Sequence, residues 1–128
     1  MRKMELVVHG KKVVDEDYRL FLVKKALCLG IKGFNAINYR KNGKEMIVVK
    51  LEGSVGLLEE YIHDIRSNFP EHAEVEEIED KCIDTYVMDI HKFLMYLQYE
   101  LWYRFAKAAS GNEIGSHHPI IVENDSIR

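Results

Sequence analysis

Proline, cysteine and long apolar runs are scarce in this sequence. Its 128 residues include only two prolines and two cysteines, and no apolar run approaches the roughly 20 residues of a membrane-spanning helix. Cys28 and Cys82 lack the spacing of a CxxC pair, and the first residues lack the pattern of a secretory signal. We therefore expect a cytoplasmic protein with reduced thiols, with Cys28 in the core, and we expect neither a disulfide-stapled secreted domain nor a membrane protein.

An excess of basic charge is also absent. The chain carries 18 basic and 21 acidic residues, a formal net charge of -3, which offers no general attraction to nucleic acid or to an anionic membrane. His117 and His118 have no Cys or Asp at a short metal-ligand spacing, and Glu113 is the nearest carboxylate. We therefore expect no nucleic acid, no membrane, no metal and no cofactor.

The residues that are present predict a folded domain with one core. The chain is 47% hydrophobic and 30% charged, as folded proteins of this length commonly are. Apolar runs of strand length occur at residues 4–8, 34–39, 44–52 and 73–78, and helical spacing occurs at residues 18–29 and 54–68. The first helix should bury Leu20, Val23 and Leu27 and end at Gly30, and the second should be capped by Ser54. The pair at residues 42–43, Asn-Gly, predicts a tight hairpin turn.

This βαββαβ order predicts an α+β fold, the ferredoxin-like plait, over residues 1–80. In that fold a four-stranded antiparallel sheet carries both helices on one face. Residues 81–110 then predict a helical extension, because apolar residues at 83–105 keep a helical spacing on nearly every side. This long C-terminal helix could pack on the same domain or on a partner. Residues 111–128 read as a flexible tail with a short strand at 119–122 as one option.

The long C-terminal helix carries two further expectations. Apolar residues point to both faces of the predicted sheet, so we expect the helix to cover the face that the first two helices leave open. Its remaining apolar side, which includes Tyr96, Tyr99, Trp102 and Tyr103, should then form a homo-oligomer contact.

The connection between the first strand and the first helix is a candidate anion site. It contains Gly10, Lys11 and Lys12, and Arg19 follows in the first turn of the helix, where free N–H groups and a partial positive charge attract anions. The same loop has three carboxylates at residues 15–17, which cap a helix but repel phosphate. Arg19 can therefore hold a small anionic ligand or pair with its acidic neighbours, and both readings stay open.

Residues 18–33, YRLFLVKKALCLGIKG, resemble the first helix of the acylphosphatase family. In that family a phosphate loop of the form GxVQGVxFR leads into a helix that ends in leucine, glycine, an apolar residue, any residue and glycine. Tyr18 and Arg19 stand in place of the Phe-Arg pair, and Leu29, Gly30 and Gly33 match the ending. The likeness continues through GFNAIN at 33–38, the Asn-Gly turn and LEG at 51–53, and covers about residues 4–79.

The resemblance implies metal-free hydrolysis of a carboxyl-phosphate anhydride to carboxylate and phosphate. It implies that Arg19 and the loop amides hold the phosphoryl oxygens and that Asn38 orients the attacking water. Asn38, however, lies one residue further from Gly33 than the family spacing, so its side chain should point to the other face unless a bulge precedes it. The loop from Gly10 to Arg19 is also one residue longer and lacks the second glycine that aims N–H groups at one anion.

Two functions are compatible with these residues. The departures favour a non-catalytic acylphosphatase-like domain that acts as an assembly or ligand-binding module. The alternative is an acylphosphatase with an eroded active site, in which Arg19 and Asn38 are catalytic and Gly10, Lys11 and Lys12 bind phosphate. We expect residues 10–17 to be an irregular loop that does not hold phosphate as the family cradle would.

Overall fold

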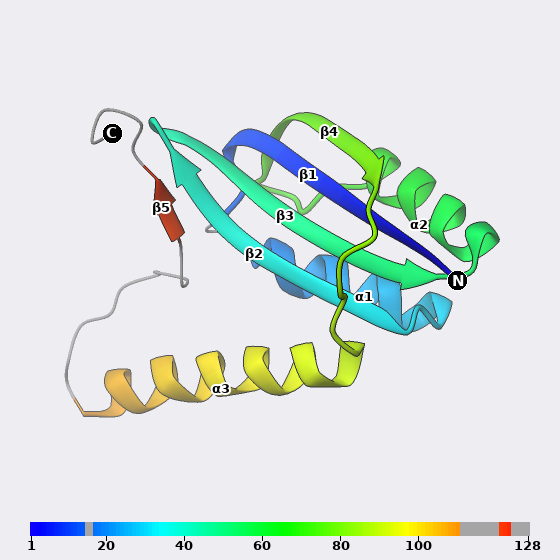
Figure 1. The fold of residues 1–128 in the computed structure, drawn as a ribbon. Coiled ribbons are helices and arrows are strands. Elements are labelled where there is room, and N and C mark those ends of the chain that lie inside the picture. Colours follow the sequence, from blue (N-terminus) through cyan, green and yellow to red (C-terminus); the bar gives the residue numbers. More distant parts are fainter. Residues whose placement is uncertain (15–16, 111–120, 124–128) are drawn as a thin grey trace.

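A five-stranded sheet with three helices forms the protein in the computed structural model, which describes residues 1–14, 17–110 and 121–123 (Figure 1). The elements in chain order are β1 (Arg2–Lys12), α1 (Tyr18–Leu29), β2 (Gly33–Lys41), β3 (Lys44–Gly53), α2 (Val55–Ser67), β4 (Glu74–Cys82), α3 (Ile90–Ala109) and β5 (Ile121–Glu123). The strand order is β4-β1-β3-β2-β5. The first four strands pair antiparallel, which confirms the predicted ferredoxin-like plait.

The short strand β5 pairs parallel to β2 at the edge of the sheet. It overlaps the strand predicted at residues 119–122, of which residues 119 and 120 lie outside the described part of the chain. The rest of the predicted tail, residues 111–118 and 124–128, also lies outside it.

Two predicted boundaries are wrong. β1 continues to Lys12, so residues 10–12 belong to a strand and not to a loop. α3 begins at Ile90 and not at residue 83, because residues 83–89 are held extended by hydrogen bonds to the sheet: the Ile83 amide donates to the Lys3 carbonyl at 3.1 Å, and the Phe34 amide donates to the Met88 carbonyl at 2.9 Å. Backbone pairing over a distance thus overrides the helical spacing of this segment.

The local turn and cap signals are confirmed. Asn42 and Gly43 join β2 to β3 with φ angles of 52° and 79°, the pair of positive values that a two-residue hairpin turn requires. Gly30 ends α1 in the left-handed conformation with φ 77°. The Ser54 hydroxyl accepts a hydrogen bond from the Leu57 amide at 3.4 Å and caps α2.

The core lies between one face of the sheet and the helices. The strands contribute alternate residues to it, among them Leu6, Val8, Phe34, Ile47, Val49 and Leu51. α1 is rotated relative to the prediction: Tyr18, Leu22, Val23 and Ala26 are buried, whereas Leu20 and Leu27 are 46% and 40% exposed. Cys28 is exposed as well, contrary to the prediction. α1 is apolar on several sides, so its spacing alone does not select the face that packs on the sheet.

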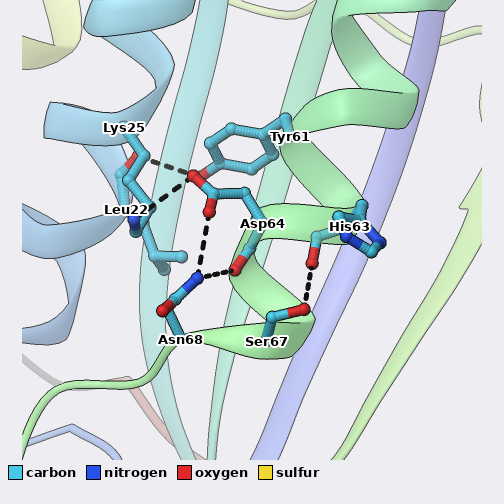
Figure 2. A network of polar contacts seen from close by, with 7 residues as sticks. All are labelled: Leu22, Lys25, Tyr61, His63, Asp64, Ser67 and Asn68. Carbon is cyan, nitrogen blue, oxygen red and sulfur yellow. Dashed lines mark hydrogen bonds and ion pairs between the residues drawn. The ribbon is translucent and has the colours of Figure 1, made fainter.

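Polar contacts fix α1 against α2 above that core (Figure 2). The buried Tyr61 hydroxyl of α2 donates to the Leu22 carbonyl of α1 at 2.9 Å, and Lys25 pairs with Asp64 at 3.2 Å. Asp64 also accepts a hydrogen bond from the Asn68 side chain at the end of α2. The helix layer is therefore held in register by side chains as well as by apolar packing.

α3 lies on the same side of the sheet as α1, beside the β2 edge (Figure 1). The Phe93 ring packs on Phe34, with ring centroids 4.9 Å apart, and Phe34 belongs to the core that α1 and α2 cover. The expectation that this helix covers the opposite face is therefore wrong.

Among the described residues, no helix covers that opposite face. Val7, Val48 and Ile37 lie side by side in register across three strands and are only partly buried. These branched side chains shield one another, so a second helical layer is not required.

Candidate functional site

A cavity of about 330 Å³ brings together the two candidate catalytic residues, Arg19 and Asn38. Arg19 stands in the first turn of α1 and is 8% exposed, and Asn38 lies in β2 and is 2% exposed. Phe93, Tyr96 and Glu100 of α3 line the opposite wall. The site therefore lies between α1, the sheet edge and α3.

Asn38 points toward the helix layer without any bulge in its pairing with β3. Phe34, Ala36 and Asn38 alternate as buried residues along β2, and Asn38 pairs with the fully buried Ile47 in an uninterrupted register. The expectation that the side chain needs a bulge to face Arg19 is therefore wrong.

Arg19 is engaged by a carboxylate of α3. Its two terminal guanidinium nitrogens donate to the two carboxylate oxygens of Glu100 at 3.2 and 2.5 Å, a bidentate arrangement that carboxylates and phosphates both favour. The side chains are 9% and 22% exposed, so the Arg19 guanidinium is largely withdrawn from solvent and its carboxylate partner comes from α3. Its predicted partners, Asp15 and Glu16, lie outside the described residues.

The loop amides are engaged by a second carboxylate, that of Glu45 in β3. One oxygen of Glu45 accepts hydrogen bonds from the Val13 amide at 2.9 Å and the Val14 amide at 3.2 Å. The other oxygen accepts from Arg40 at 2.8 Å. The burial of this carboxyl raises its pKa, but the hydrogen bonds from Arg40 and the two amides outweigh burial and lower the pKa below its ordinary value.

The predicted phosphate-binding residues Gly10, Lys11 and Lys12 lie in β1. Gly10 pairs with Glu45 on one side and with Val75 on the other, and a Cβ at this position would lie 2.0 Å from the Glu74 carbonyl oxygen. Gly10 is therefore required by the close approach of β4. Lys11 and Lys12 are exposed at the end of the strand.

The site thus holds two of its own anions where an oxyanion would be expected. Two amides after β1 do converge on one oxygen atom, as a cradle would, but that atom belongs to Glu45. A phosphoryl group would have to displace Glu100 to reach Arg19, and would have to displace Glu45 to reach the Val13 and Val14 amides. The hydrogen-bond donors of this site therefore bind two carboxylates of the chain itself.

Glu45 and Glu100 are the residues that the sequence analysis missed. Glu45 continues the alternation of the buried residues Ile47, Val49 and Leu51. A carboxylate on the same face of a strand as these apolar residues is the feature of the sequence that points to Glu45 as a functional residue. Glu100 is the only acidic residue of α3 and lies seven residues after the buried Phe93, on the same side of the helix.

No group of three or more His, Cys, Asp or Glu side chains lies together as a metal site would require, within the described part of the chain. His117 and His118 fall outside that part. In the same described residues, no helix is both long enough and apolar enough to cross a membrane.

The fold and the site residues together define an acylphosphatase-like domain. The family model described as Acylphosphatase matches residues 4–94, which is well over half of the chain and extends beyond the predicted likeness into the start of α3. The chain belongs to the acylphosphatase family.

Three solved structures illustrate the similarity. Full-length HypF in a phosphate- and nucleotide-bound form has a TM-score of 0.53 at 19% identity, over 66% of this chain and 11% of that one. The acylphosphatase of Bacillus subtilis has a TM-score of 0.50 at 16% identity, over 67% and 89%. That of Coxiella burnetii has a TM-score of 0.48 at 20% identity, over 66% and 83%.

The first two of these similarities show the fold alone. The chain spans about a tenth of the length of HypF, with 11% of that protein covered. The comparison with curated proteins finds no match.

Proposed function

We propose that this protein is a non-catalytic member of the acylphosphatase family that acts as an assembly module. The observation that carries this proposal is the pair of internal carboxylates: Glu100 on Arg19 and Glu45 on the Val13 and Val14 amides. In the family these donors are the ones that hold the phosphoryl oxygens. Donors that already bind carboxylates of the chain itself are not available for a transition state.

Charge supports the same proposal. Glu45 is 8% exposed, and its lowered pKa keeps it ionised at neutral pH. In the hydrolysis of an acyl phosphate the phosphoryl oxygens carry negative charge and the departing carboxylate develops more, which carboxylates fixed at the phosphate-binding donors would oppose. A ligand-binding role without catalysis would meet the same repulsion if the ligand were an anion.

One observation favours the alternative, an acylphosphatase that hydrolyses a carboxyl-phosphate anhydride. Arg19 and Asn38, the arginine and asparagine of the family pattern, line the same cavity. If Glu100 left Arg19, both side chains could reach one substrate there.

Hydrolysis of benzoyl phosphate decides between the two. We expect the purified protein to release phosphate no faster than buffer does, and Arg19→Ala to behave in the same way. Turnover that is lost in Arg19→Ala but kept in Arg66→Ala, a control arginine in the exposed ion pair with Asp80, would overturn the proposal.

A further inference from the structure

An exposed apolar stripe on α3 is the surface that the site and the fold leave unexplained. Met95, Tyr99, Trp102 and Ala106, which we call the outer face of α3, are all exposed. They recur at intervals of four, three and four residues, which places them on one side of a helix. Buried Phe93 and Leu97 lie on the opposite side.

We propose that a second copy of this chain packs on the outer face of α3, forming a homodimer. The inference rests on the proposed assembly function and names its partner. The four-three-four spacing is that of the apolar seam with which one helix packs against another. Because the two copies present the same seam, a two-fold arrangement buries both at once.

The exposed area is large enough for such an interface. Tyr99 and Trp102 of the outer face and Phe105 of the adjoining flank are 64–71% exposed, which leaves on the order of 400 Å² of aromatic surface uncovered on each chain. Met95 and Leu101, 71% and 44% exposed, add to it. The total, on the order of 600 Å², lies at the upper end of the apolar patches found on monomers and amounts to most of the roughly 800 Å² per partner of a standard interface.

The outer face also has a suitable shape. Beside the seam, Gln98, Leu101, Trp102 and Phe105 line an apolar hollow of about 330 Å³. Aromatic side chains that enter such pockets supply most of the energy of an interface. α3 is already held on its own chain by Phe93 and Glu100, so the face is ordered before a partner arrives.

Charge favours a second copy over a membrane or a nucleic acid. Dimer formation would remove no charged side chain from water in the middle of the seam. Glu100 faces Arg19, and Arg104 lies 3.9 Å from Asp17. The two lysines of α3, Lys92 and Lys107, lie near its two ends. Binding to an anionic surface needs more basic residues than this, and the chain has a net charge of -3.

Sedimentation of the full chain tests the proposal. We expect a species of twice the 15.0 kDa chain mass and, in Tyr99→Glu/Trp102→Glu, a monomer whose self-association is at least about a hundredfold weaker. Tyr86→Glu is the matched control, because Tyr86 lies outside α3 and is 71% exposed, as Tyr99 is. It should remain a dimer. Circular dichroism and thermal melting verify that each variant folds.

Three outcomes would overturn the homodimer. They are a wild-type monomer at concentrations up to about 100 µM, a dimer that survives in the folded double variant, and a monomer that instead binds phosphatidylserine vesicles through Tyr99 and Trp102. None of these results changes the hydrolysis assay, which depends on Arg19. Failure of the homodimer is therefore distinguishable from failure of the non-catalytic assignment.

Discussion

Removing the Glu45 carboxylate should destabilise the protein strongly at neutral pH. Glu45→Ala leaves the Val13 and Val14 amides without the acceptor that lies 2.9 and 3.2 Å away, next to side chains that are 0% and 2% exposed. A buried donor left without a partner costs about 1–3 kcal/mol. Because two donors lose their acceptor, we expect a total loss of about 2–4 kcal/mol.

Glu45→Gln should cost less, because its amide oxygen can still accept a hydrogen bond. The variant loses the charge that strengthens the bonds from Arg40 and the amides, so we expect about 1 kcal/mol. Urea unfolding at pH 7 measures both losses. Glu76→Ala, on an exposed position of β4, is the control and should stay within about 0.5 kcal/mol of wild type.

The loss of stability caused by Glu45→Gln should be smaller at acidic pH than at neutral pH. The pKa of Glu45 is lower in the folded protein than its ordinary value of 4.5, so the carboxylate stabilises the fold above pH 4.5. That stabilisation is lost as the pH falls through the folded pKa. The gap between wild type and Glu45→Gln should therefore close on acidification. Equal stability of the two at pH 7, or a gap that widens in acid, would refute the reasoning.

Four further substitutions test other contacts by urea unfolding. Gly10→Ala should destabilise by about 3 kcal/mol or fail to fold, because the new Cβ would lie 2.0 Å from the Glu74 carbonyl oxygen. Gly43→Val should cost about 1 kcal/mol or more at φ 79°, and an unchanged midpoint would contradict the turn assignment. Arg19→Met and Glu100→Leu should each cost about 2 kcal/mol, and the double variant should recover most of it if the pair is structural. Additive losses would contradict that reading.

The elements of the fold were predictable because their signals are local. Asn42 and Gly43 set the turn, Gly30 ends α1 and Ser54 caps α2, and each acts within four residues of its own position. The alternation along β3 likewise places Ile47, Val49 and Leu51 on one face of the strand, which is the buried face in the structure. The order of such elements was sufficient for the plait.

The site was not predictable in the same way, because its contacts join distant parts of the chain. Glu45 is 32 residues from Val13, and Glu100 is 81 residues from Arg19. Spacing could not select among the apolar sides of α1, so Leu20 was assigned to the core although Tyr18 and Leu22 occupy it. The extended path of residues 83–89 likewise depends on partners in β1 and β2.

α3 connects the closed site to the proposed interface. The family match ends at residue 94, and Glu100 and the whole outer face of α3 lie beyond that point. One side of this added segment pairs with Arg19, and the other exposes Tyr99 and Trp102. A partner that holds α3 in place would also hold Glu100 on Arg19, since two events that need the same helix position stabilise each other. Assembly and loss of the anion site are therefore expected to reinforce one another through a single helix.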